Sequence, residues 1–175
     1  MVPELLLKTV LEEYSLAWEG VHGVSHWARV LENGRRLALL TGANLEVVEL
    51  FAVLHDSKRK NDGIDFLHGP EGAVNAAKLR GFAFELDDAN FELLRRACAD
   101  HTRGFTRADV TVQTCWDADR LDLNRVGILP RQKLLCTQPA RDPALLGWAN
   151  ERASARAIPD LVLSEWGIDL NQIGK

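Results

Sequence analysis

The sequence predicts an all-α fold built as one domain. Apolar residues recur every three to four positions along most of the chain, and no stretch alternates apolar with polar residues as a half-buried strand does. The length of 175 residues, with 46% hydrophobic and 26% charged residues, suits a single core and excludes disordered and disulfide-scaffold classes. We therefore expect one domain over residues 1–175, with its core at about 20–128 and a helical extension at about 130–175.

Turn and capping residues set the bounds of the first helices. A periodic stretch covers residues 3–18 and ends before the glycine turn at 20–23. Ser25 is a competent N-cap for a helix that runs to about Thr41, and Gly42 suits the position after its C-terminus. These signals predict two helices at the start of the chain.

The later helices follow the same logic. A third starts at Asn44 and its apolar face ends on His55, before a polar loop at 56–69. Pro70 suits the first turn of a fourth, and Asp87 or Asp88 the cap of a fifth. The remaining expected helices cover about 111–126, 143–157 and 160–166, and we expect the last two either to pack on the core or to build a homo-oligomer interface.

Charge and composition exclude several classes of function. The chain has 21 basic and 25 acidic side chains, a net charge of −4 and no basic stripe, which disfavours nucleic acid as a partner. The start lacks the pattern of a secretory signal and no apolar run could span a membrane, so we expect a cytoplasmic protein without a membrane partner. The three cysteines lack metal-ligand spacing and suit a reduced core.

All 5 histidines precede residue 102, and each lies near the end of an expected helix. Imidazole is a common transition-metal ligand, and carboxylates complete such sites. A single inward histidine is more often a hydrogen-bonded core residue, but several on separate helices are difficult to satisfy in pairs. A shared metal would satisfy them together. The histidines are His22, His26, His55, His68 and His101.

An acidic run at 117–122 offers carboxylates to the same site. At about 100° per residue, Asp117 and Asp119 point roughly 200° apart on a helix, so only one can face inward. Asp119 lies on the apolar face with Trp116 and Leu123, and Asp117 lies outside it. We therefore predict that Asp119 faces inward and that Asp117 lies on the outer face.

Five ordered elements resemble the HD-domain superfamily of metal-dependent phosphohydrolases. His26-Trp27-Ala28-Arg29-Val30 is similar to the H-x-x-R-V motif of that family, and Ala52-Val53-Leu54-His55-Asp56 to its A-x-L-H-D motif. His68-Gly69-Pro70-Glu71-Gly72-Ala73, Asp100-His101 and Ala118-Asp119-Arg120-Leu121 resemble the elements that follow. The resemblance covers about residues 20 to 128 and implies a helical bundle with a C-terminal helical appendage.

Carried over to this sequence, the resemblance implies metal ligands and a reaction. His26, His55, Asp56 and Asp119 would bind one divalent ion, with Mn, Fe, Co, Ni and Zn equally suited to such ligands. His68 and His101 would bind a second metal, contact substrate or support the first site. The implied activity is hydrolysis of a nucleotide or other small phosphate ester, with Asp56, His68 or His101 accepting a proton.

The chain departs from two branches of the family. No G-Y-P element follows His101, which disfavours cyclic-dinucleotide hydrolysis, and Asp122-Leu123 stands where the alarmone hydrolase branch has His-Asn. The superfamily also includes di-iron oxygenases, and that reading gains weight if His68 and His101 are both ligands. A nucleotide-binding protein without turnover is the other alternative.

The basic run Ser57-Lys58-Arg59-Lys60-Asn61 directly follows the His-Asp pair. It is either a solvated loop or a phosphate clamp, and its place favours phosphate binding by Lys58 and Arg59. Arg29, one turn after His26, is expected to reach the same pocket. We expect Arg120 to pair with Asp56 or Asp117, and His22 to form a local hydrogen bond.

Overall fold

The structure is a computed structural model that describes residues 1–170 and 172, and within them all regular secondary structure is helical. This confirms the all-α prediction. The α-helices are α1 (Glu4–Glu13), α2 (Val24–Thr41), α3 (Leu45–Leu54), α4 (His68–Leu79), α5 (Asp88–Asp100), α6 (Val110–Arg120), α7 (Pro143–Ser154) and α8 (Leu161–Ser164). Four short 3-10 helices join them: η1 (His101–Arg103), η2 (Leu123–Val126), η3 (Gln132–Leu134) and η4 (Pro139–Arg141).

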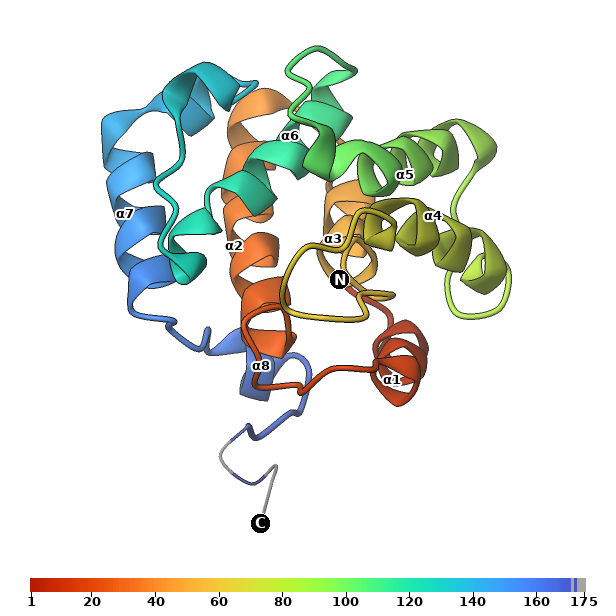
Figure 1. Ribbon diagram of the computed structural model, residues 1–175. Coiled ribbons are helices and arrows are strands. Elements are labelled where there is room, and N and C mark those ends of the chain that lie inside the picture. Colours follow the sequence, from red (N-terminus) through yellow and green to blue (C-terminus); the bar gives the residue numbers. More distant parts are fainter. Residues whose placement is uncertain (171, 173–175) are drawn as a thin grey trace.

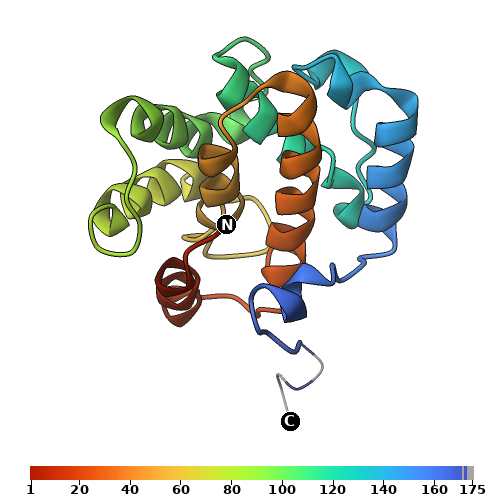
Figure 2. The same cartoon turned by 180° about the vertical axis from the view of Figure 1, so that it is seen from behind.

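Helix α2 runs through the middle of the bundle (Figure 1). Helices α3 and α6 pack against it, α5 packs against both of these, and α4 pairs with α5. Figure 2 shows α1 and α7 on opposite sides of the molecule, with α2 and α3 between them. The fully buried core side chains include Trp27, Phe51 and Trp116, one from each of α2, α3 and α6.

Several predicted helix ends are confirmed by capping contacts. Gly42 adopts the left-handed conformation after α2, with φ of 74°, and its N–H donates to the Ala38 carbonyl. The Asn44 side chain accepts hydrogen bonds from two backbone N–H groups in the first turn of α3. Asp87 caps α5 in the same way through the N–H of Asn90.

Other ends differ from the prediction. Helix α1 ends at Glu13, because Tyr14 is extended and its hydroxyl donates to the His22 carbonyl. Gly23, not Ser25, is the N-cap of α2. Helix α4 begins at His68 rather than Pro70, and α6 ends at Arg120 before a turn into η2. The last two differences place His68 and Asp122 next to the candidate site.

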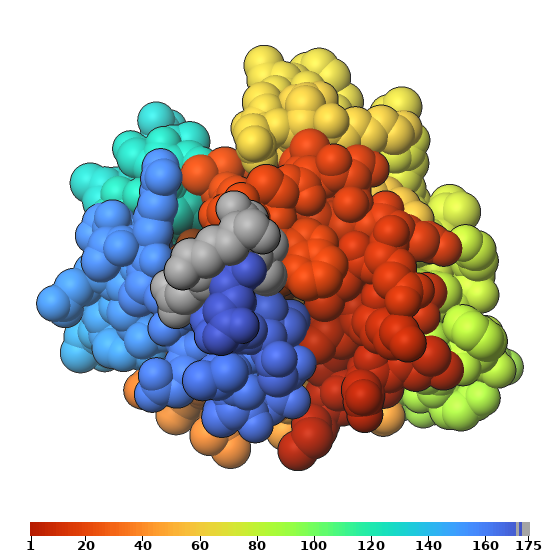
Figure 3. Space-filling model, turned by 90° about the horizontal axis from the view of Figure 1, so that it is seen from below, coloured from red at the N-terminus to blue at the C-terminus, as the bar shows by residue number. Residues whose placement is uncertain are grey.

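The C-terminal extension packs on the bundle, which is one of the two predicted alternatives. Helix α7 contacts η2 and η4, and α8 contacts α2. Figure 3 shows the blue C-terminal segment lying beside the red N-terminal segment on one face of the molecule. The end of the extension, residues 171 and 173–175, lies outside the described residues. None of the helices described here has both the length and the apolar character that a membrane span requires.

Helix α2 closely approaches α3 and α6 at Gly34. A methyl group at Gly34 would lie 2.5 Å from Cγ1 of Val48 in α3 and 3.6 Å from Cβ of Ala118 in α6. Glycine is therefore required for α2 to pack this tightly against both neighbours. Gly147, on an exposed face of α7, has no such neighbour.

We expect Gly34→Ala to lower the free energy of unfolding by about 1–3 kcal/mol, because the added methyl overpacks the core. The control Gly147→Ala should raise it by about 0.5–1 kcal/mol, since alanine favours an exposed helix. Denaturant titration of the two variants measures both values. Equal effects of the two substitutions would contradict a tight contact at Gly34.

Candidate metal centre

Four histidines from separate helices meet in one buried place. His26 lies in the first turn of α2, His55 directly follows α3, His68 begins α4, and His101 follows α5. All four side chains are buried, and their rings lie edge to face in a chain from His26 to His68. The bundle thus brings together residues that are up to 75 positions apart in sequence (101 − 26).

Each of these rings uses Nδ1 to hydrogen-bond an oxygen. The partners are Asp122 Oδ2 at 2.7 Å from His26, the Phe51 and Ala52 carbonyls at 3.1 Å from His55, the Asp65 carbonyl at 2.5 Å from His68, and the Cys98 carbonyl at 2.8 Å from His101. Because these oxygens only accept, Nδ1 must carry the proton in every ring. The neutral rings are left with a lone pair on Nε2, which is the form that ligates metals.

The free nitrogens face one another in pairs. Nε2 of His26 lies 3.1 Å from Nε2 of His55, and Nε2 of His68 lies 3.0 Å from Nε2 of His101. Two lone pairs at this distance repel each other unless a proton or a metal cation lies between them. Each pair therefore has the chemistry of a cation site.

The Asp56 carboxylate lies between the two pairs. Its Oδ2 is 3.6 Å from Nε2 of His26 and 3.8 Å from Nε2 of His55. Its Oδ1 is 3.2 Å from His68 and 3.6 Å from His101. Oδ1 is buried and has no hydrogen-bond partner among the described residues. A buried carboxylate oxygen without a donor is costly, and a cation would compensate it.

Asp119 completes the first group. Its Oδ1 lies 3.6 Å from Nε2 of His26 and 3.9 Å from Nε2 of His55. Ligand atoms placed tetrahedrally at about 2.1 Å from a transition metal lie about 3.4 Å apart, close to these separations. Potential ligand atoms of His26, His55 and Asp119, and of His55, Asp56 and His101, all lie within 4.8 Å of one another. The residues present therefore fit a metal ion.

Burial and charge set the protonation of the cluster. Burial lowers the pKa of His26, His55 and His68, which keeps these rings neutral. Burial also raises the pKa of Asp56, but His55, His101 and their neighbours outweigh it, so the pKa falls well below the usual value. At His101 burial is outweighed by the neighbouring carboxylates of Asp56 and Asp119, and the pKa is raised.

Two glycines let α4 approach the cluster. A methyl group at Gly72 would lie 2.8 Å from the Leu54 carbonyl oxygen and 2.9 Å from that of His55. A methyl at Gly69 would lie 2.8 Å from the Cys98 carbonyl oxygen and 3.2 Å from Nδ1 of His101. These two positions, three residues apart on one face of α4, place His68 against the backbone that carries the other histidines.

Asp117 lies on the outer face of α6, as helix periodicity predicts, but that face is buried. Its side chain is fully buried, and its carboxylate accepts hydrogen bonds from the backbone N–H groups of Cys136 and Thr137 and from the Thr137 hydroxyl, at 2.7–2.8 Å. Burial raises its pKa above the usual value. The segment after η3 thus covers the outer face of α6, and Asp117 still points away from the histidines.

Of the adjacent basic residues Lys58 and Arg59, Arg59 lies beside the cluster and Lys58 does not. Arg59 is buried beside the cluster, with Nη1 3.2 Å from Nε2 of His68 and 3.8 Å from Oδ1 of Asp56. Lys58 instead pairs with Glu13 of α1 at 2.5 Å. This contact corrects the prediction that Lys58 clamps a phosphate, because it turns the side chain toward α1.

Arg29 and Arg120 also differ from expectation. The guanidinium of Arg29 hydrogen-bonds both carboxylate oxygens of Asp122 and the Ala157 carbonyl, so its role is to hold Asp122 rather than to reach the cluster. Arg120 forms no ion pair with an acid among the described residues, and it donates to the carbonyls of Leu134 and Phe105. The segment at 134–136 supplies acceptors that the helix pattern does not predict.

Sequence reasoning missed two residues of the site. Asp122 orients His26 through Nδ1, and Arg125 donates from Nη2 to Nδ1 of His22 at 3.2 Å. His22 is itself buried, and its Nδ1 lies 3.5 Å from Oδ2 of Asp56. The predicted local hydrogen bond of His22 is wrong, since Nε2 lies 3.3 Å from the carbonyl of Asp62, in another loop. The spacing of Asp122 three residues after Asp119 was a usable signal, because such residues share a helix face.

An all-helical shell that gathers His, His-Asp and Asp around one buried place defines the HD class. No family model matches the chain, and no curated protein matches it. A solved structure, a predicted HD superfamily hydrolase from an uncultured Thermotogales bacterium, matches with a TM-score of 0.65 and 27% identity over 93% of this chain and 91% of that one. The chain therefore belongs to the HD-domain superfamily, and the likeness is to one of its hydrolases.

The two acids of α6 should separate metal binding from stability. We expect Asp119→Ala to lose bound metal, because it removes a carboxylate from the His26 and His55 pair. Asp117→Ala should keep the metal and lower the free energy of unfolding by about 1–3 kcal/mol, because buried N–H groups lose their acceptor. Elemental analysis and denaturant titration measure the two effects. Loss of metal from both variants would contradict the assignment.

Proposed function

We propose that the protein is a metal-dependent phosphohydrolase that acts on a nucleotide or another small phosphate ester. The observation that carries this proposal is the buried Asp56 carboxylate between two histidine pairs whose Nε2 lone pairs converge on it. Such a donor set suits a divalent ion, and the likeness to an HD superfamily hydrolase supports hydrolysis.

The proposed metal ligands are His26, His55, Asp56 and Asp119. A divalent Mn, Fe, Co, Ni or Zn ion there would supply Lewis-acid activation of water and of the phosphoryl group. The Nδ1 hydrogen bond from His26 to Asp122 fixes the ring that the site needs and increases its basicity as a ligand. His68, His101 and Oδ1 of Asp56 form the second group, which holds a second ion in a two-metal form of the enzyme.

A cavity of about 290 Å³ opens beside this cluster and suits the substrate. His101 and Asp119 lie at its inner end, and Leu123, Leu134 and Leu135 give it an apolar wall. Arg131, exposed at the cavity, is available for a negative charge. The volume lies at the lower limit of about 300–1,000 Å³ typical for ligand pockets, so a small ester fits the cavity better than a large one.

Protons and charge would be handled by His101, which lines this cavity, and by Arg59, which lies beside His68. In a one-metal form, His101 would accept the proton of the attacking water, since the acids around it raise its pKa toward the range that general bases use. Arg59, held by the carbonyls of Asn61 and Gly63, would offset negative charge that develops near His68. Both roles are proposals that rest on position and charge.

The second candidate function is a di-iron oxygenase, and the position of Asp56 favours it. One carboxylate with an oxygen toward each histidine pair suits a bridge between two irons. An optical spectrum of anaerobically purified protein, recorded before and after exposure to oxygen, tests this alternative. A new absorption band with two irons per chain would support it against phosphate-ester hydrolysis.

The direct test is metal analysis followed by a phosphate-release screen over nucleotides and small phosphate esters. We expect at least one divalent ion per chain and turnover that Asp56→Ala abolishes. Bound metal without phosphate release from any ester would instead favour a nucleotide-binding protein or the oxygenase.

Adjacent basic residues provide a matched test of charge at the site. We expect Arg59→Gln to lower kcat/KM about ten- to a hundredfold, the equivalent of roughly 1.5–3 kcal/mol for a charge-assisted contact. Lys58→Gln should leave kcat/KM near the wild-type value, because Lys58 pairs with Glu13. Phosphate release on the best substrate of the screen gives both values, with metal content and circular dichroism as controls. Equal losses in the two variants would contradict a specific role for Arg59.

A further inference from the structure

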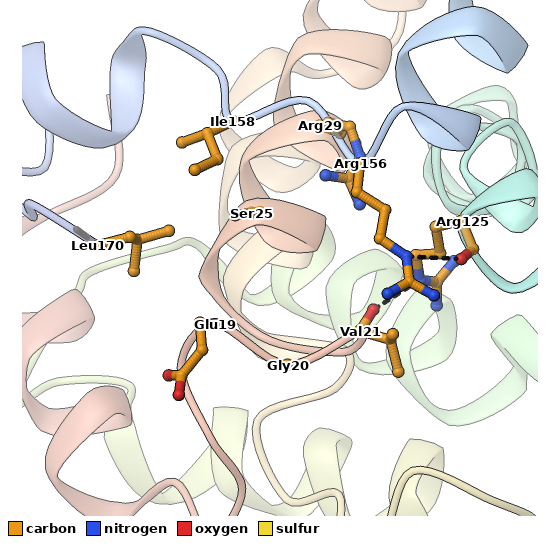
Figure 4. Close-up of a pocket in the computed structure, with 9 residues that line it drawn as sticks. All are labelled: Glu19, Gly20, Val21, Ser25, Arg29, Arg125, Arg156, Ile158 and Leu170. Atoms are coloured by element: carbon orange, nitrogen blue, oxygen red, sulfur yellow. Dashed lines mark hydrogen bonds between the residues drawn. The ribbon is translucent and has the colours of Figure 1, made fainter. Parts of the chain in front are cut away.

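A second cavity, of about 170 Å³, lies where the start of α2 meets η2 and the segment after α7 (Figure 4). It shares no lining residue with the cavity proposed for the substrate. Its lining comprises Glu19, Gly20, Val21, Ser25, Arg29, Arg125, Arg156, Ile158 and Leu170. Three of these residues are arginines, which is the feature that indicates a ligand.

Two of the arginines are buried and share one carboxylate contact. Arg29 and Arg125 are 3% and 6% exposed. Among the described residues, the carboxylate that forms an ion pair with both is Asp122, at 2.7 Å from Nε of Arg29 and 3.7 Å from Nε of Arg125. Asp122 also accepts the Nδ1 hydrogen bond of His26. An anion in the cavity would add a second negative partner for these two buried guanidinium groups.

Arg156 brings a third guanidinium to the same cavity. Its Nε donates to the Arg125 carbonyl at 3.3 Å, and its two terminal nitrogens have no partner among the described residues. Figure 4 shows the side chain reaching across the cavity to Arg125. Arg156 has a φ of 48°, a left-handed conformation that costs energy for a residue other than glycine and marks functional sites more often than others.

The start of α2 adds donors to this group. Its N-cap, Gly23, has no side chain to cap the helix, and Ser25 in the first turn lines the cavity. The first turn of this 18-residue helix thus contributes Ser25 to the cavity that the arginines line. Glu19 is the acid in the lining, and Figure 4 shows it at the opposite end from the Arg125 and Arg156 side chains.

We propose that this arginine pocket, defined by Arg29, Arg125, Arg156 and Ser25, binds an oxyanion of the phosphate class. Its volume is below the range of about 300–1,000 Å³ for organic ligands, so the occupant is small or enters by its phosphoryl end. Donors approach from α2, from η2 and from residue 156. A tetrahedral phosphate, with oxygens pointing in several directions, uses such donors better than a planar carboxylate.

The pocket is connected to the metal centre by direct contacts. Arg125 donates to His22, which lies beside Asp56, and Arg29 holds the Asp122 carboxylate that orients His26. An anion in the pocket would therefore compete with Asp122 for the guanidinium of Arg29. This proposal concerns binding and does not depend on the reaction that the metal centre performs.

Isothermal titration calorimetry of the metal-loaded, full-length protein with inorganic phosphate tests the site. Arg156→Asn removes the exposed guanidinium and keeps a residue that tolerates the left-handed conformation, so the fold should be retained. We expect its phosphate affinity at this site to fall about ten- to a hundredfold. Arg156→Lys, which keeps the charge without the fork, should lose less.

Arg96→Asn is the matched control, because Arg96 is exposed on α5 at a different face and should bind phosphate as the wild type does. A binding event at the metal centre would persist in both variants. Parallel titration with methyl phosphate separates two sources: equal affinity points to the phosphoryl group of a larger molecule, and loss of binding points to free phosphate. Wild-type affinity in Arg156→Asn, or no saturable binding to the wild type, would overturn the proposal.

Discussion

The buried carboxylate of Asp56 is the constraint on which the arrangement of the bundle depends. A carboxylate removed from water is unstable unless a cation or a donor compensates it, and here four imidazoles from separate helices direct Nε2 to the place where a cation would bind the carboxylate. Each imidazole must present Nε2 inward, which requires an acceptor for Nδ1. The Ala52 and Cys98 carbonyls lie in the last turns of α3 and α5, where helix ends leave carbonyls unpaired, and the Asp65 carbonyl lies in the loop before α4. The ends of α3 and α5 are thus part of the site.

The sequence predicted the elements whose signals are local. Caps such as Asn44 and Asp87 could be predicted because a side chain and the N–H groups it accepts lie within three residues. The choice of Asp119 over Asp117 as the residue nearer the histidines agrees with the geometry, since helix periodicity fixes relative direction. The burial of Asp117 could not be predicted, because it depends on N–H groups of 136 and 137 that fold back over α6. Asp122, on the same face as Asp119, could have been found by extending the same calculation by one turn.

Two adjacent basic residues in the turn after α3 contact different parts of the molecule. Lys58 and Arg59 stand in one basic run, yet one pairs with α1 and the other lies beside His68. In a turn of this kind consecutive side chains point in different directions, and composition alone cannot predict which of them faces the site. The resemblance to the HD-domain superfamily supplied the ligand positions, while the contacts of the supporting residues His22 and Arg125 follow only from the folded structure.

The segment after α7 gives the C-terminal extension a place in the chemistry of the centre. The Ala157 carbonyl accepts from Arg29, Arg29 holds Asp122, and Asp122 holds the ring of His26. Two side chains, Arg29 and Asp122, therefore link a residue of the extension to a proposed metal ligand. A substitution or deletion near residue 157 would therefore change the orientation of the His26 imidazole, which lies 131 positions earlier in the sequence (157 − 26).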